Sequence, residues 1–146
     1  MVLSADIKKN NINKYSISLL IDDDKINLDF DEKLEVFKDK TFKLSVISDV
    51  PSADSTIENK YTLTLLKNDS HCSHPNRTDI VVSGFISLKV DGKKFDFDNS
   101  FDSQLSKVNL DGTLFNSHTV TLESDKIAQK NLFCDGLISI EVELSL

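Results

Sequence analysis

Apolar residues occupy every second position along most of the chain. The last segment shows this most clearly, because Ile138, Ile140, Val142, Leu144 and Leu146 alternate with serines and glutamates. Successive side chains of a β-strand point to opposite faces, so this spacing predicts strands with one buried face. The same alternation recurs in seven other segments: Tyr15–Ile21, Ile26–Phe30, Phe42–Val46, Tyr61–Leu65, Val82–Val90, Phe95–Phe97 and Val120–Leu122. The pattern therefore predicts roughly eight strands.

The segments between these strands carry turn residues. Asp91-Gly92 predicts a tight hairpin turn, and the long loops are expected at 48–60 and 67–79. One short helix is predicted at 124–132, where Ser124 can cap its start.

Short strands at this spacing, without long helices, predict an all-β fold: an antiparallel eight-stranded β-sandwich with at most one short helix. A chain of 146 residues is long enough for one domain with a genuine core. We expect that domain to span residues 12–146 and residues 1–11 to form an N-terminal extension.

Composition predicts a cellular location. No apolar run is long enough to cross a bilayer, and the first ten residues lack the apolar core of a secretion signal. A cytoplasmic or nuclear location is therefore expected. In such a reducing compartment Cys72 and Cys134 are expected to be free thiols.

The chain carries a net charge of −7, with scattered basic residues. Nucleic acids and anionic membranes require clustered lysine and arginine, so neither is expected as a partner. An acidic protein favours a basic partner.

Clusters that could perform chemistry are few. His71, Cys72 and His74 lie close together, but no second pair of ligands completes a zinc site. The aspartates of 96–102 resemble half of an EF-hand loop, yet Phe101 stands where glycine is needed. Four glycines cannot form a phosphate loop, and no nucleophile has a recognisable base. We therefore expect no enzyme activity, no catalytic residues, no bound metal and no cofactor.

Several segments together resemble the MATH domain, the meprin and TRAF homology fold. The final segment LFCDGLISIEVEL (132–144) resembles the closing turn and last strand of that family. Three upstream segments are similar to its other strands, in the same order: TFKLSV at 41–46, ENKYTLTLL at 58–66, and DIVVSGFISLKVDGKKFDFDNSF at 79–101.

The resemblance implies a non-enzymatic protein–protein interaction module. MATH domains bind an extended peptide of another protein in a shallow groove, and many act as substrate or adaptor recognition domains in ubiquitin-ligase or signalling assemblies. Carried over by position, the peptide-binding residues are Leu65, Phe85, Asp111, Gly112, Leu114 and Phe115. A basic peptide would contact Asp111 and the aspartates of 96–102.

Two alternatives remain open. A C2-like, calcium-dependent lipid-binding module could use Asp22–Asp24 together with 96–102. A scaffold domain that self-associates through an edge strand, and so forms a homo-oligomer, is the other.

Overall fold

The computed structural model describes residues 2–8, 15–54, 59–76 and 78–145. Within these ranges the chain contains fourteen strands and no helix, and therefore no helix that is long and apolar enough to cross a membrane. The strands are β1 (Val2–Lys8), β2 (Ile17–Ile21), β3 (Lys25–Asn27), β4 (Phe30–Asp31), β5 (Val36–Phe37), β6 (Lys40–Pro51), β7 (Lys60–Ser73), β8 (Ile80–Ser83), β9 (Ile86–Val90), β10 (Lys93–Phe95), β11 (Phe101–Gln104), β12 (Lys107–Val108), β13 (Thr113–Ser124) and β14 (Phe133–Leu144).

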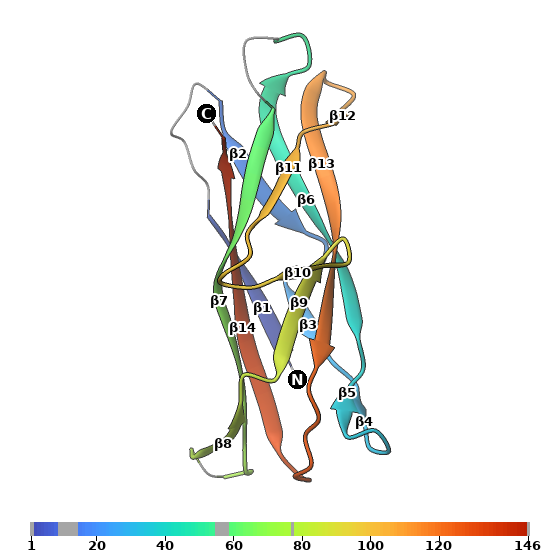
Figure 1. Cartoon of the computed structure of the whole chain (residues 1–146), viewed down its shortest axis with the longest axis vertical. Helices are drawn as coiled ribbons and strands as arrows, with labels where there is room; N and C mark the ends of the chain where they lie inside the picture. Colours follow the sequence, from blue (N-terminus) through green and yellow to red (C-terminus); the bar gives the residue numbers. More distant parts are fainter. Residues whose placement is uncertain (1, 9–14, 55–58, 77, 146) are drawn as a thin grey trace.

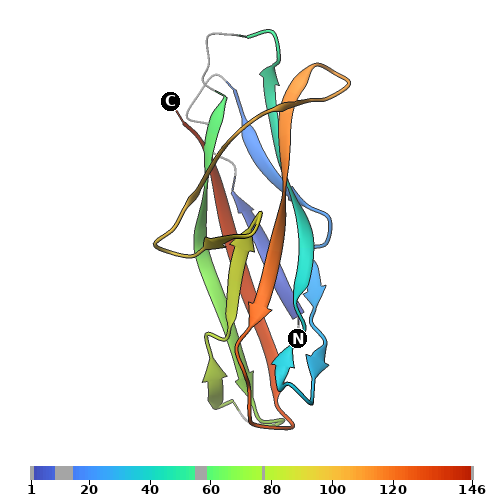
Figure 2. The ribbon, with the colours of Figure 1, turned by 45° about the vertical axis from the view of Figure 1, so that its right-hand side comes forward.

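Two sheets pack face to face, as the prediction of an antiparallel β-sandwich required (Figures 1 and 2). The first sheet has the order β11-β7-β14-β1-β3, with β8 also paired to β7. The second sheet has the order β10-β9-β13-β6-β2, with β12 also paired to β13. A separate hairpin, β4-β5, lies at the lower right in Figure 1. The strands are more numerous than the predicted eight because several are short pieces at the edges.

The core lies between the two sheets and is built from the alternating positions. In β14, Ile138, Ile140, Val142 and Leu144 are buried, as predicted, whereas Leu146 lies outside the described residues. β14 stands inside its sheet, with β7 on one side and β1 on the other. Strand partners on both sides, together with one face on the core, hold this strand in place.

Two local predictions were wrong. The loop expected at 67–79 begins later, because β7 continues to Ser73 with small residues, Ser70 and Cys72, at its buried positions. The helix expected at 124–132 is an irregular segment instead, and it still buries Ile127. A helix this short gains little without an apolar face to pack, so one buried isoleucine does not sustain it.

The long strand expected over Val82–Val90 is two strands in two different sheets. β8 pairs with β7 in the first sheet, and β9 pairs with β13 in the second. Between them Gly84 has a φ of 67°, a left-handed conformation that glycine adopts without steric cost. The predicted Asp91-Gly92 turn is confirmed, with positive φ at both residues and Val90 paired to Lys93.

The prediction of free thiols was also wrong. Cys72 and Cys134 face each other across β7 and β14, with their Cα atoms 4.0 Å apart, and form a disulfide. The sequence places them 62 residues apart and gives no sign of this register.

Residues of the expected N-terminal extension form a strand of the sandwich. β1 pairs in parallel with β14, from Leu3 opposite Gly136 to Lys8 opposite Glu141. On its other side β1 pairs with β3. The expected boundary between residues 11 and 12 lies outside the described residues.

Candidate functional site

The six residues predicted to bind a peptide do not form one surface. Leu65, Phe85 and Leu114 are buried in the core. Asp111 and Gly112 lie in the turn between β12 and β13, whereas Phe115 is half-buried on β13, beneath the ammonium group of Lys107. The structure therefore gives these positions no common groove.

The aspartates invoked for calcium do not converge either. Among the described residues, no group of three or more His, Cys, Asp or Glu side chains could hold a metal ion. Asp96 instead accepts hydrogen bonds from the Asn99 side chain and from two backbone N–H groups of its own turn. These hydrogen bonds, of which the one from the Asn99 side chain has the largest effect, lower the pKa of Asp96. The Asp96 carboxylate is therefore already engaged by hydrogen bonds within its own turn. The calcium alternative gains no support.

A chain of polar side chains crosses the core instead. His118 lies buried on β13; its Nδ1 is 2.6 Å from Asp91 Oδ2, and its Nε2 meets the hydroxyl of Tyr61. Asn116 donates to the Tyr61 hydroxyl (3.0 Å) and to the backbone oxygen of Gln104 (2.8 Å). With its proton on Nδ1, His118 donates to Asp91 and accepts from Tyr61, which satisfies both ring nitrogens.

Asp91, His118 and Tyr61 follow one another in the order of a catalytic triad. Unlike the nucleophile of a triad, however, Tyr61 is not accessible from the surface. Tyr61 is fully buried, and burial raises the pKa of its hydroxyl, so it is neither exposed nor ionised as a nucleophile. Burial raises the pKa of Asp91, but the bonds from His118 and Thr119 outweigh this and lower it overall. The arrangement fits a structural role that links the β9–β10 turn to β7 and β13.

A pocket of about 330 Å³ opens at the lower end in Figure 1, beside the disulfide. The β4-β5 hairpin forms one wall and the segment before β14 forms the other. Phe30 and Phe37 meet edge to face at 5.2 Å, and Phe37 stacks on the buried Phe85 at 5.8 Å. The complete lining is Phe30, Glu32, Glu35, Phe37, Ile127, Gln129, Lys130, Asn131, Leu132, Phe133 and Cys134.

The backbone around this pocket is held in uncommon conformations. Glu35 and Asn131 both have positive φ, of 56° and 59°, which costs energy for a residue with a side chain. The N–H of Ile127 donates to the Glu35 backbone oxygen (2.7 Å), and Lys126 pairs with the Glu35 carboxylate at 3.8 Å. These contacts tie the two walls together, so the pocket is a preformed feature of the fold.

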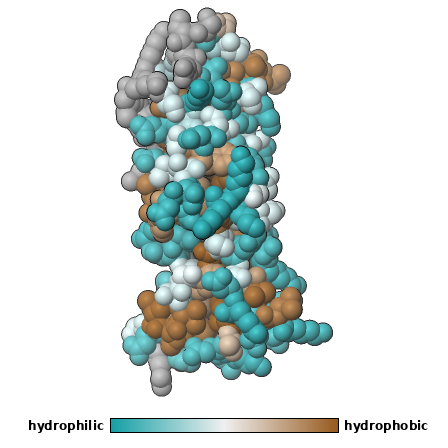
Figure 3. Space-filling view, in the orientation of Figure 1, coloured by the Kyte–Doolittle hydropathy of each residue, from teal (hydrophilic) through white to brown (hydrophobic). Residues whose placement is uncertain are grey.

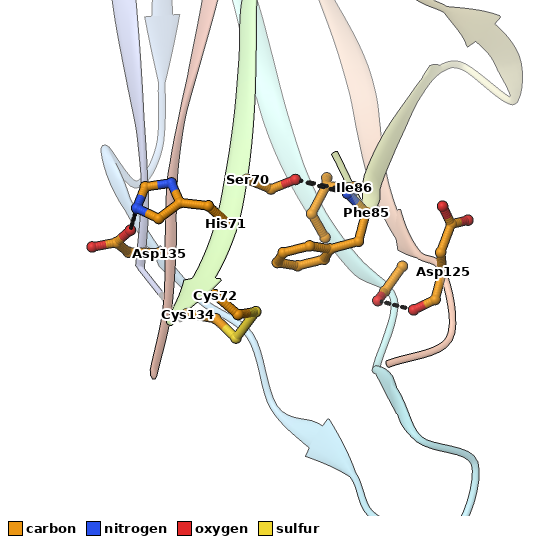
Figure 4. The surroundings of a disulfide bond; sticks show 9 residues. Ser70, His71, Cys72, Phe85, Ile86, Asp125, Cys134 and Asp135 are labelled. Atoms are coloured by element: carbon orange, nitrogen blue, oxygen red, sulfur yellow. Dashed lines mark hydrogen bonds and ion pairs between the residues drawn. A yellow bond between two sulfur atoms is a disulfide. The ribbon is translucent and has the colours of Figure 1, made fainter. Parts of the chain in front are cut away.

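The Cys72–Cys134 disulfide joins β7 to β14 next to this pocket (Figure 4). The next residues along the two strands, His71 on β7 and Asp135 on β14, also face each other, with His71 Nε2 2.6 Å from Asp135 Oδ1. Ser70 accepts hydrogen bonds from the N–H groups of Phe85 and Ile86, which joins β7 to the start of β9. Cross-links therefore connect both sheets near the pocket.

Comparisons with known proteins address the fold. No protein-family model and no curated protein sequence matches the chain. Among the solved structures that match is that of the CooA pilin subunit from enterotoxigenic Escherichia coli. The TM-score is 0.55 at 10% sequence identity, covering 86% of this chain and 96% of the pilin chain. A likeness at this identity shows a similar fold.

Two predictions are corrected by these findings. The resemblance to a MATH domain was wrong, because the sandwich is similar to a pilin subunit and no MATH model matches. The predicted cytoplasmic or nuclear location was wrong as well. It conflicts with the Cys72–Cys134 bond, since disulfides form and persist in oxidising compartments. The role in ubiquitin ligases depended on the resemblance and is withdrawn with it.

Sequence reasoning missed the pocket because its walls come from segments about one hundred residues apart. The run Asn131-Leu132-Phe133 holds two apolar residues beside a turn former, which is a weak sign of an exposed aromatic group. Nothing in the sequence pairs this run with Phe30.

Proposed function

We propose that this protein is a non-enzymatic assembly subunit that binds an extended segment of another polypeptide as a strand of its first sheet. The segment is residues 2–8 of a second copy, placed where β1 lies in the single chain. This is β-strand addition, in which backbone hydrogen bonds supply affinity and alternate side chains supply specificity.

The observation that carries the proposal is the pairing of β1. Every other strand pair within the described ranges is antiparallel, whereas β1 and β14 run parallel. β1 also separates β14 from β3, so its removal leaves two unpaired strand edges over a core that contains Ile138 and Ile140. Those edges are a site for an extended segment.

The pairing of β1 with β14 does not require that both belong to one chain. The two strands come from opposite ends of the described sequence, with all the other strands between them. The same residues of a second copy would make identical contacts, and exchange of an identical element between protomers is a low-cost route to assembly. The similar solved structure is named as a subunit, in keeping with this proposal.

A peptide exchange experiment tests the proposal. The full-length chain is incubated with a fluorescent peptide of residues 1–11, and bound peptide is measured by anisotropy after gel filtration. We expect uptake that approaches one peptide per chain over hours to days, because the resident strand must leave first. A peptide with Ala5→Pro should not bind, since proline interrupts the backbone pairing. Absence of uptake of the unmodified peptide, even after warming close to the melting midpoint, contradicts the proposal.

A further inference from the structure

The two cysteines of the disulfide lie in different surroundings. Cys72 is fully buried (0% exposed) and belongs to the core between the sheets. Cys134 is half-buried and forms part of the lining of the pocket beside the β4-β5 hairpin. One end of the bond is therefore enclosed by packed side chains, whereas the other borders an open space of about 330 Å³.

The backbone pairing of the two cysteines differs in the same direction. Cys72 has a strand partner on each side, Cys134 of β14 and Val82 of β8. Cys134 is the second residue of β14, and within the described part of the chain β1 pairs with β14 only from Gly136 onward. The sheet therefore holds Cys72 from two sides and Cys134 from one. Because strand ends open at low free energy, Cys134 can move while the rest of the sheet stays paired.

The surface around Cys134 admits a small molecule. Apolar residues gather at the lower end of the face drawn in Figure 3, where Figure 1 places β8 and the β4-β5 hairpin. Phe133, the neighbour of Cys134, is 65% exposed and also lines the pocket. The charged lining residues carry both signs, Glu32 and Glu35 against Lys130, so the pocket selects no charged ligand. Its volume lies within the range of roughly 300–1,000 Å³ found for ligand pockets.

The histidine next to the bond in sequence takes no part in its chemistry. Successive side chains of a strand point to opposite faces, so His71 and Cys72 diverge. Figure 4 shows His71 directed away from the sulfur atoms toward Asp135, with Nε2 2.6 Å from Oδ1. The rate at which a thiolate attacks a disulfide depends on which sulfur it can reach. Access therefore decides between the two sulfur atoms, and it favours Cys134.

We propose that Cys134 is a site of reversible thiol–disulfide exchange, at which a small uncharged thiol enters the pocket and forms a mixed disulfide. The thiolate attacks Cys134 Sγ, and the Cys72–Cys134 bond breaks as the new sulfur–sulfur bond forms. The electron pair of the broken bond passes to Cys72 Sγ, which takes up the proton that the small thiol lost. Cys72 is the resolving residue, since its attack on the mixed disulfide expels the small thiol and restores the original bond.

This site is separate from the proposed strand exchange. The described pairing of β1 with β14 runs from Gly136 to Glu141, beyond Cys134. Exchange at Cys134 therefore does not require residues 2–8 to leave the sheet, and it adds a covalent reaction that strand addition does not use. During oxidation of the reduced chain the same steps run with a small disulfide as donor, so Cys134 reacts first and Cys72 second.

Single-cysteine variants provide the first test. Cys72→Ser keeps only the Cys134 thiol, and Cys134→Ser keeps only the Cys72 thiol. Each full-length variant is incubated in the folded state with hydroxyethyl disulfide, and formation of the mixed disulfide is followed by intact mass. Cys72→Ser should react at least about tenfold faster than Cys134→Ser, because the buried Cys72 thiol must wait for local opening. Its adduct should be stable, since no resolving thiol remains.

Two controls show that the difference arises from the fold. Far-ultraviolet circular dichroism verifies that both variants keep their strands. In urea that unfolds both variants, the two thiols should react at similar rates, because neither is then shielded by the core. A difference that persists in the unfolded chains would assign it to neighbouring residues in sequence and overturn the proposal.

A second test uses the unmodified chain, so the result does not depend on either variant folding. The oxidised, folded protein is mixed with mercaptoethanol, quenched with acid, alkylated in denaturant and digested. The rate of opening should rise in proportion to the thiol concentration, and the mixed disulfide should lie on Cys134 with the alkyl group on Cys72.

Three further results overturn the proposal: equal rates for the two folded variants, faster reaction of the Cys72 thiol, or a mixed disulfide located on Cys72. An opening rate that does not depend on the concentration of mercaptoethanol would also overturn it, because the bond would then be reached only after the protein unfolds.

Discussion

Small hydroxyl side chains supply hydrogen bonds inside the sandwich where the strands themselves do not pair. Ser70 receives the N–H groups of Phe85 and Ile86 at the point where the chain leaves one sheet for the other. Ser48 donates to the Leu114 backbone oxygen (2.6 Å). Each bond satisfies a buried polar group that would otherwise cost about 1–3 kcal/mol. Serine in these strands is therefore structural, although the sequence pattern assigns serines to the outer face.

The bond between Asp91 and His118 predicts how stability depends on pH. The folded state lowers the pKa of Asp91 below its ordinary value of 3.8. A carboxyl group of this kind stabilises the fold above the unfolded pKa, and the stabilisation is lost as pH falls through the folded pKa. Asp91→Asn should reduce the free energy of unfolding by about 1–2 kcal/mol at pH 7, because His118 loses an ionised acceptor.

Urea unfolding of both chains between pH 7 and pH 2.5 measures this difference. It should be largest near neutrality and shrink as pH falls below about 4, where the Asp91 carboxylate of the unfolded chain takes up a proton, and disappear once the folded chain is protonated as well. Asp98→Asn is a suitable control, because Asp98 lies in an exposed turn away from His118. A constant difference across the whole pH range would contradict the assigned role of Asp91.

Gly84 predicts a second effect at the residue scale. No atom lies within 4 Å of the position that an added Cβ would occupy, so a side chain fits sterically. The φ of 67° remains unfavourable for any residue with a Cβ, and Gly84→Ala should cost about 1–2 kcal/mol. Gly84→Asn should cost less than Gly84→Val, because asparagine tolerates this region better. Thermal melting of the three variants measures the order, and equal costs for Asn and Val would argue against a backbone origin.

At the scale of elements, the disulfide joins two strands that already pair over twelve residues each. Cys72 on β7 and Cys134 on β14 close a long segment of chain, which limits the unfolded state more than the folded one. For a separation of 62 residues, the chain-entropy relation gives about 4 kcal/mol. Reduction should therefore lower the free energy of unfolding by about 2–4 kcal/mol and leave the strand content unchanged.

Far-ultraviolet circular dichroism and urea unfolding, with and without reductant, measure this prediction. The double variant Cys72→Ala, Cys134→Ala separates loss of the bond from effects of the reductant, and should match the reduced chain. An identical midpoint for the oxidised and reduced chains would show that pairing of β7 with β14 alone sets the stability.

The elements themselves were largely predictable from alternation. Alternation of large apolar residues marks the buried faces of Phe42–Val46 in β6, Val120–Leu122 in β13 and Ile138–Leu144 in β14. The first half of β13 was missed, because its inward positions include Asn116 and His118. The second half of β7 was missed, since its inward positions hold Ser70 and Cys72 rather than large apolar groups. The division of 80–90 into β8 and β9 depends on one glycine within an otherwise continuous apolar pattern.

At the scale of the whole molecule, the sequence predicted the class and not the arrangement. Alternating strands with turns between them are common to many sandwiches, so a resemblance in strand order pointed to the wrong family. The parallel pairing of β1 with β14, the disulfide and the pocket walls all join distant segments. Local pattern carries no information on such contacts, and for this reason the six expected binding positions do not form one surface.

The position of β14 inside the first sheet has a consequence for how the protein is made. Phe133–Leu144 follows every other strand in chain order, yet β7 and β1 both need it as a neighbour. These residues must therefore emerge from the ribosome before the first sheet can form. Until then, the edges of β7 and β1 that pair with β14 are exposed and could be bound by chaperones. Cys72 likewise has no disulfide partner until Cys134, 62 residues later, has been synthesised.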